Sequence, residues 1–239
     1  LPFAVPDINV VVVPDENWVA VSQAALPPVS TGRFTIHGSH DRGVVPRGPN
    51  TLLIDAGEAF GTAHHATTQG CLSALDRLTR RRRFERVLDL GCGSGVLAIA
   101  AARALPHATI EGSDNDPQAI AVARANARLN GVAGRIRMRV AEGLPRSRVR
   151  ANSYDLILAN ILADPLVAMA PDVARALAPG GVTVLSGLLV RQAEHVIAAY
   201  RSHGLSLADH RRIAGWSTLT LIKDCRAVVR PSAPPKRAA

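Results

Sequence analysis

The chain has few aromatic residues, few cysteines and almost no lysine. Aromatic residues make up 3% of its 239 residues, so a surface that stacks the bases of single-stranded nucleic acid is not indicated. The three cysteines, Cys71, Cys92 and Cys225, have no metal-like spacing, and their odd number does not suit a disulfide scaffold. We therefore expect no metal site, and a reducing, cytoplasmic location.

Long hydrophobic runs are missing as well. The best candidate, 96–110, is interrupted by Arg103, Pro106 and His107, whereas a membrane span needs about 18 unbroken apolar residues. The opening residues LPFAVPDINV have neither the charged segment nor the cleavage pattern of an export signal, and they lack an initiator Met. We expect a globular protein with no membrane partner, and a sequence that is a fragment of a longer chain.

The net charge of +9 comes from arginine, since Lys223 and Lys236 are the two lysines. The arginines are scattered along the chain, with short groups at 80–83, 135–139 and 146–150. This pattern predicts a solvated basic surface that favours transient proximity to the ribosome or to RNA.

Residues 87–95 read VLDLGCGSG and are followed by good helix formers. An apolar strand, a turn with Gly91, Gly93 and Gly95, and a helix predict a site where a nucleotide-like cofactor approaches the backbone and the helix N-terminus. The spacing G-x-G-x-G differs from the G-x-G-x-x-G of dinucleotide sites. An NAD-binding oxidoreductase nevertheless remains an alternative.

Two acids favour S-adenosyl-L-methionine over NAD. Asp89 lies inside the strand, where a negative charge suits an ammonium or sulfonium group better than a pyrophosphate. Asp114 ends the next extended segment, 23 residues after Gly91, where a carboxylate can accept hydrogen bonds from both ribose hydroxyls. With its neighbour Asn115, it completes the predicted cofactor site.

Apolar segments of strand and helix length alternate from residue 84 onward. The pattern predicts an α/β, Rossmann-like fold with a mostly parallel sheet and a closing antiparallel hairpin around Gly215 and Trp216. Thr67 or Thr68 is expected near the cap of the first helix, and Leu52–Ile54 reads as a further strand. The expected strands are 87–90, 108–113, 136–140, 155–159 and 182–186, and the expected helices are 66–79, 96–105, 117–129, 164–177 and 190–202.

Asn160 follows the apolar strand YDLILA and is the candidate catalytic residue. Parallel strands deliver the residue after their carboxyl ends to the ligand crevice, and an amide can accept from a neutral amine and hold its lone pair toward a methyl carbon. The alternative is that Asn160 caps the helix that begins near Asp164.

Three segments together resemble the PrmA family, the bacterial methyltransferases of large-subunit ribosomal protein eleven. They are AFGTAHHATT at 59–68, VLDLGCGSGVLAIAA at 87–101 and ANILADPL at 159–166, supported by LSGLL and GWSTLTL further on. The resemblance implies a class I methyltransferase fold and trimethylation of lysine ε-amines and of the N-terminal α-amine. By motif match, Thr68, Gly91, Asp114 and Asn160 would contact S-adenosylmethionine, with Phe60 and Thr62 nearby.

The family also carries a small substrate-recognition domain before the catalytic one. We therefore expect residues 1–57 to be a remnant of that region and its linker, 58–225 to be the catalytic domain, and 226–239 to be a disordered basic tail; a monomer is expected. The alternatives are methylation of lysine or glutamine in another protein, methylation of RNA, and a non-catalytic nucleotide-binding module.

Overall fold

The computed structural model describes residues 27–55, 65–144 and 149–225. Its main element is a seven-stranded sheet with the order β6-β5-β4-β7-β8-β10-β9, in which β10 runs antiparallel to both of its neighbours and the other pairs are parallel. The strands are β4 (Arg86–Leu90), β5 (Thr109–Asp114), β6 (Ile136–Val140), β7 (Tyr154–Asn160), β8 (Leu177–Leu189), β9 (Leu205–Ile213) and β10 (Trp216–Lys223). The predicted α/β fold, mostly parallel sheet and closing hairpin are confirmed.

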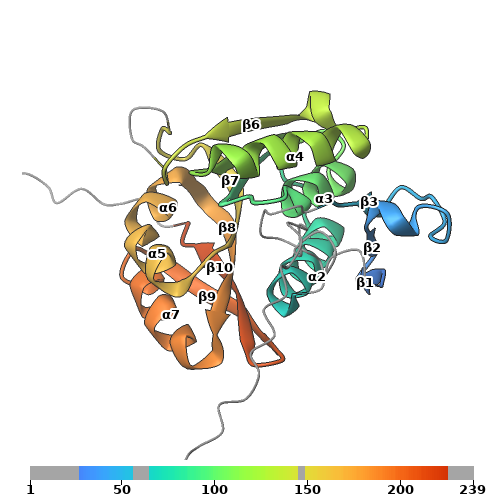
Figure 1. Ribbon diagram of the computed structural model, residues 1–239. Coiled ribbons are helices and arrows are strands. Elements are labelled where there is room, and N and C mark those ends of the chain that lie inside the picture. The colour runs from blue at the N-terminus through green and yellow to red at the C-terminus, as the bar shows by residue number, and fades with distance from the viewer. Residues whose placement is uncertain (1–26, 56–64, 145–148, 226–239) are drawn as a thin grey trace, which may run out of the picture.

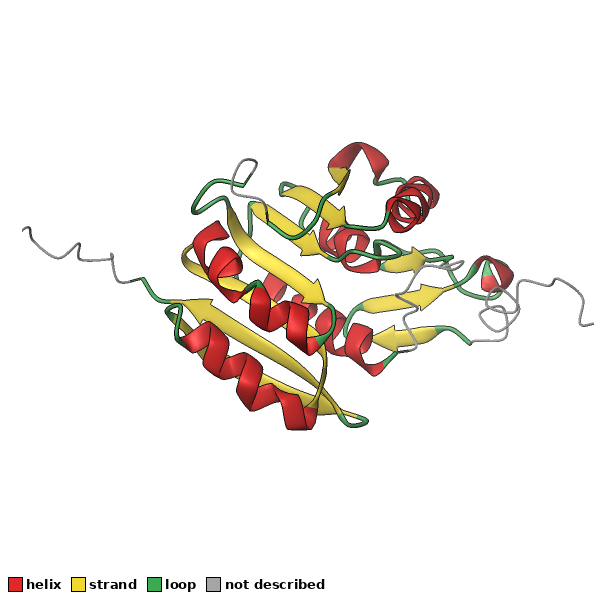
Figure 2. Cartoon of the chain, turned by 60° about the vertical axis from the view of Figure 1, so that its left-hand side comes forward, coloured by secondary structure: helices red, strands yellow, loops and turns green. Residues whose placement is uncertain are grey.

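Helices cover both faces of this sheet (Figures 1 and 2). One layer contains α2 (Ala66–Arg81), α3 (Val96–Ala104) and α4 (Pro117–Leu129), and the other contains α5 (Ala163–Ala168), α6 (Ala170–Ala176) and α7 (Ala193–Arg201). Each layer buries its own apolar cluster against the sheet. This double covering explains why the central strands are nearly continuous apolar runs. None of the described helices is long and apolar enough to cross a membrane.

The helix predicted at 117–129 is confirmed at both ends, because its start carries a clear signal. Asp116 is the N-cap, its carboxylate accepts from the Gln118 N–H at 2.8 Å, and Pro117 occupies the first turn. The single helix predicted at 164–177 is wrong. The chain breaks at Met169 into α5 and α6, because Pro171 has no N–H and its ring does not fit a helix interior.

The helix predicted at 66–79 starts as predicted and ends at Arg81. His65 is the N-cap of α2, and Thr67 and Thr68, expected near the cap, are buried in its first turn. One strand boundary differs more. The strand predicted at 182–186 extends over Leu177–Leu189, because β8 pairs with β7 at Leu177 and over 182–186 and with β10 from Val182 to Leu189.

A second, three-stranded sheet precedes the large one and lies beside α2 and α3 (Figure 1). It contains β1 (Val29–Thr31), β2 (Phe34–His37) and β3 (Thr51–Leu53), and the short 3-10 helix η1 (Ser39–Asp41) follows β2. β3 confirms the strand predicted at 52–54. Phe34, Ile36 and Leu52 share one apolar cluster with α2 and α3, so the described part of 1–57 packs directly on the larger sheet's helices. The domain boundary at 57 stays a prediction.

Asn126 in α4 and Asn130, the C-cap of that helix, hold the free edge of β3. The Asn130 side chain donates to the Leu53 carbonyl at 2.7 Å and accepts from the Leu53 N–H at 3.0 Å. Asn126 makes the same pair of bonds with Asp55, at 3.0 and 3.1 Å, and also donates to the Ser94 carbonyl at 2.9 Å. One amide therefore joins the glycine turn to the segment that follows β3.

Candidate functional site

A cavity of about 450 Å³ lies at the carboxyl ends of β4, β5 and β7. This is the edge where the strand order of the sheet reverses around β4, since β5 lies on one side and β7 on the other. Open parallel sheets bind their ligands at such a switch point. The wall includes the predicted site residues Asp89, Gly91, Gly93, Asp114, Asn115 and Asn160. The other lining residues are His65, Cys92, Val96, Leu97, Ile161, Leu162, Gly187 and Trp216.

The glycine turn has the backbone geometry that the sequence predicts. Gly91, Gly93 and Gly95 all have positive φ, at 67°, 51° and 81°, a region that favours glycine. A Cβ on Gly91 would lie 2.4 Å from the Ile161 side chain, so only glycine lets β4 and the segment after β7 approach this closely. The amides of Gly91 and Cys92 both donate to the Ser113 carbonyl, which fixes the turn to β5.

Asp114 is joined to the glycine turn. Its Oδ2 accepts from the Gly93 N–H at 2.8 Å, and its Oδ1 accepts from the Asp116 N–H at 3.1 Å. A carboxylate has about four acceptor positions, so lone pairs remain for two hydroxyl donors in the cavity. Asn115, the next residue, also lines the wall.

Asp89 is fully buried and only half satisfied. Its Oδ2 accepts from the Ala98 N–H in α3 at 2.8 Å, while Oδ1 has no hydrogen-bond partner among the described residues. Burial raises the pKa of Asp89 to about 7, and the nearby charge of Asp114 adds to the rise, although the Ala98 N–H opposes it. From the sequence, Asp89 is expected simply to carry a negative charge. In the structure, its charge needs a positive or hydrogen-bond-donating group in the cavity.

Asn160 ends β7 and lines the same cavity. Its Nδ2 donates to the Thr68 hydroxyl at 3.3 Å, and its Oδ1 is buried without a partner among the described residues. The helix-cap alternative is wrong, because Leu162 is the N-cap of α5 and no side-chain cap bond forms there. Thr68 therefore contacts the site through Asn160 and is not itself in the cavity wall.

Comparisons with known proteins agree with this geometry. The family model described as "Ribosomal protein L11 methyltransferase (PrmA)" matches residues 3–224. The chain belongs to the PrmA family. A ribosomal protein L11 methyltransferase of Bradyrhizobium diazoefficiens is 51% identical over 209 residues, which cover 87% of this chain and 70% of that protein. One from Rhizobium etli is 49% identical over 224 residues, covering 92% of this chain and 76% of that protein.

Solved structures show the same fold around this PrmA site. The crystal structure of a ribosomal protein L11 methylase from Lactobacillus delbrueckii superposes with a TM-score of 0.73 at 26% identity, covering 82% of this chain and 98% of that one. A precorrin-6y methyltransferase from Geobacter metallireducens reaches 0.57 at 17% identity, covering 70% and 94% of the two chains. The predicted class I methyltransferase fold and the predicted PrmA membership are thus confirmed, and the chain is a protein methyltransferase.

Three residues that line the PrmA cavity were not among the predicted site residues, although His65 lies in the AFGTAHHATT segment and Trp216 in the predicted hairpin turn. His65 and Trp216 pack edge to face, with ring centroids 4.7 Å apart, and both line the cavity. They are separated by 151 positions and meet only because α2 contacts β10. Gly187 has a φ of 87°, and a Cβ there would lie 2.2 Å from the Ile161 carbonyl oxygen. The LSGLL segment at the end of β8 supplied the signal for Gly187 in the sequence.

Two predicted residues, Phe60 and Thr62, lie outside the described residues. Cys92 lines the cavity, but burial strongly raises the pKa of its thiol, followed by the charges of Asp89 and Asp114. The thiol is thus protonated at neutral pH, which does not suit a nucleophile. Among the described residues, no group of three or more His, Cys, Asp or Glu side chains is placed to hold a metal ion.

Proposed function

We propose that this protein uses S-adenosyl-L-methionine to methylate amino groups of ribosomal protein L11, both lysine ε-amines and the N-terminal α-amine. Family membership supports the reaction and the substrate, since the relatives at 51% and 49% identity are named ribosomal protein L11 methyltransferases. The observation that carries the cofactor is Asp89, a buried acid in the cavity wall whose Oδ1 has no partner among the described residues.

The cavity residues fit this cofactor in character. Asp114 would accept from the ribose hydroxyls, and Asn115 lies beside it. The turn at Gly91 and Gly93 would let the cofactor approach the backbone, while Asp89 would compensate its positive charge. Phe60, Thr62 and Thr68 complete the proposed set by family resemblance. The cavity volume falls in the range of roughly 300–1,000 Å³ that is usual for small-molecule sites.

Bound there, S-adenosylmethionine supplies a methyl group that its sulfonium already activates. The chain's own task is to position a neutral amine and to exclude water. Asn160 is suited to this task, because its Nδ2 is fixed by Thr68 and its Oδ1 has no partner among the described residues. We propose that Oδ1 accepts a hydrogen bond from the substrate amine and so orients its lone pair.

Intact-mass spectrometry tests the proposal. The protein, extended upstream to include a recognition region, is incubated with S-adenosylmethionine and purified ribosomal protein L11. We expect mass to increase in steps of one methyl group, up to three on a single amine, and Asn160→Ala to slow every step. Ribosomal RNA is the parallel acceptor. Methyl groups on RNA, or on glutamine in place of lysine, would overturn the proposed substrate while leaving the methyltransferase fold intact.

The proposal also covers the location, the oligomeric state and the domain bounds of the enzyme. We propose a cytoplasmic monomer with transient proximity to the ribosome, whose catalytic domain covers 58–225 and whose tail, 226–239, lies outside the described residues. The relatives from Bradyrhizobium diazoefficiens and Rhizobium etli are matched over 70% and 76% of their own length. Light scattering at several concentrations tests the monomer, and a dimer mass at all of them would reject it.

A further inference from the structure

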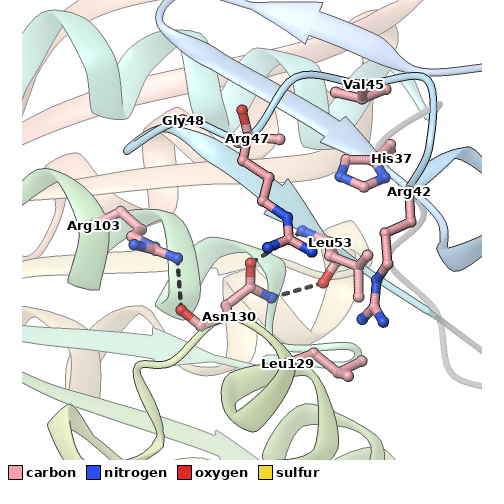
Figure 3. Close-up of a pocket in the computed structure, with 10 residues that line it drawn as sticks. His37, Arg42, Val45, Arg47, Gly48, Leu53, Arg103, Leu129 and Asn130 are labelled. Carbon is pink, nitrogen blue, oxygen red and sulfur yellow. Dashed lines mark hydrogen bonds between the residues drawn. The ribbon is translucent and has the colours of Figure 1, made fainter.

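A second cavity, of about 350 Å³, lies where the small sheet meets α3 and α4 (Figure 3). It shares no lining residue with the cavity at the glycine turn. Its wall combines three arginines and a histidine with apolar side chains: His37, Arg42, Arg47, Leu53, Arg103 and Leu129. No acidic residue is among the residues that line it.

The arginines of this second cavity are not compensated. The guanidinium groups of Arg42 and Arg47 form no ion pair and no hydrogen bond with any described residue, and both residues are exposed. Some other described arginines are paired with acids; Arg33 and Arg80, for example, both bind the carboxylate of Asp76. Like charges gathered without an acid repel one another, so the cavity is suited to an anion.

Two acids, Asp41 and Asp55, lie close to this loop in the sequence. Asp41 lies 3.1 Å from the imidazole of His40. Asp55 accepts from the Ser39 N–H at 2.8 Å and from its hydroxyl at 2.5 Å. Neither carboxylate lines the cavity, so neither supplies the missing negative charge.

The loop that carries Arg42 and Arg47 is held by its own backbone. The amides of Val44 and Val45 both donate to the Asp41 carbonyl, at 2.9 and 3.0 Å. Thr51 then closes the loop, since its N–H donates to the Gly48 carbonyl and its hydroxyl donates to the Pro46 carbonyl, both at 3.2 Å. Because this loop is ordered, little conformational entropy is lost when a ligand binds.

Arg103 and His37 are fixed from two other elements. Arg103 comes from α3, and its Nη2 donates to the Asn130 carbonyl at 2.6 Å, which leaves Nη1 without a partner among the described residues. His37 ends β2 and is 6% exposed; its Nδ1 donates to the Gly38 carbonyl at 2.8 Å, which leaves Nε2 as an acceptor in the neutral ring. Three separate elements therefore present nitrogen atoms to one cavity.

We propose that this cavity binds a phosphoryl group, carried either by a phosphorylated small molecule or by the backbone of RNA. Guanidinium groups match phosphate oxygens with paired N–H donors, and a phosphate monoester carries about two negative charges at neutral pH. A carboxylate would neutralise less of the charge of Arg42, Arg47 and Arg103. Leu53 and the half-exposed Leu129 provide an apolar wall for the remainder of the ligand.

Calorimetry with inorganic phosphate and with ribose 5-phosphate tests the site, in the presence of saturating S-adenosylhomocysteine so that the other cavity is filled. Arg42→Gln and Arg47→Gln should each weaken phosphate binding by about tenfold or more, because each removes a charge-assisted hydrogen bond. Arg201→Gln is the matched control. It removes the same charge from an exposed arginine at the end of α7, in the opposite helix layer.

The outcomes of this experiment distinguish the two sources of the phosphoryl group, RNA and a small phosphorylated molecule. A short single-stranded RNA that displaces phosphate, and whose binding drops in Arg47→Gln, would identify the RNA backbone as the source. RNA binding unaffected by Arg47→Gln, with phosphate binding lost, would identify a small phosphorylated molecule. No phosphate binding by the wild type at millimolar concentration, or an equal loss in Arg201→Gln, would overturn the proposal. Methyl transfer is not the readout, so failure here leaves the proposed function untouched.

Discussion

Replacing Asp89 by Asn should change how the stability of the protein depends on pH. Asp89 is fully buried, and its Oδ2 accepts from the Ala98 N–H while Oδ1 has no partner among the described residues. An asparagine amide keeps the size of the side chain and its acceptor for Ala98, but it does not ionise. Comparing the two proteins across pH therefore isolates the cost of the buried charge.

The magnitude follows from the pKa. Folding raises the pKa of Asp89 from 3.8 to about 7, mainly through burial. Between these values the unfolded chain is ionised while the folded protein holds the proton, so the folded state binds more protons and its stability falls as pH rises. A shift of this size corresponds to roughly 4 kcal/mol. This loss of folding stability begins near pH 4 and is complete above pH 7.

Urea denaturation at pH 4.5, 6 and 8 measures the effect. The free energy of unfolding of Asp89→Asn, relative to wild type, should rise between pH 4.5 and pH 8 by several kcal/mol. Glu142→Gln, which removes an exposed acid with no interaction among the described residues, should show no such trend. A difference between Asp89→Asn and wild type that is constant with pH would refute the buried-charge argument.

Three further outcomes are expected. Asn160→Ala should lower turnover by about ten- to a thousandfold with little change in melting temperature, since the only hydrogen bond of its side chain among the described residues is the one to Thr68; normal turnover would remove its catalytic role. Asp114→Ala should weaken S-adenosylhomocysteine binding in calorimetry by about 1.5–3 kcal/mol, and unchanged affinity would contradict the ribose assignment. Gly187→Ala should lower the melting temperature strongly, because its Cβ would lie 2.2 Å from the Ile161 oxygen and its positive φ adds about 1–2 kcal/mol; a wild-type melting curve would argue against that contact.

Local signals in the sequence predicted the fold well. The α4 prediction was confirmed at both ends because Asp116 and Pro117 satisfy the helix start through neighbours in the chain. The glycine turn was likewise readable, since its three glycines need positive φ whatever surrounds them. The helix break at Pro171 was not predicted. This proline divides the single helix predicted at 164–177 into α5 and α6.

The candidate site was less readable because burial and distant contacts decide its chemistry. No local pattern shows that Asp89 loses all exposure and has a pKa near 7. The pairing of His65 with Trp216 depends on how α2 packs against β10. The arginines of the second cavity were interpreted only as scattered surface charge, since Arg42, Arg47 and Arg103 converge in space and not in sequence.

The asparagine pair on α4 acts as a substitute strand. Residues four apart on a helix are separated by about 6.0 Å along its axis, and alternate residues of a strand by about 6.6 Å. Asn126 and Asn130 can therefore occupy the hydrogen-bonding positions at Asp55 and Leu53 that a fourth strand would fill. The backbone amide protons of Leu53 and Asp55 should therefore exchange slowly with solvent, although they lie at the edge of the small sheet. That edge also offers no template for pairing with a second molecule.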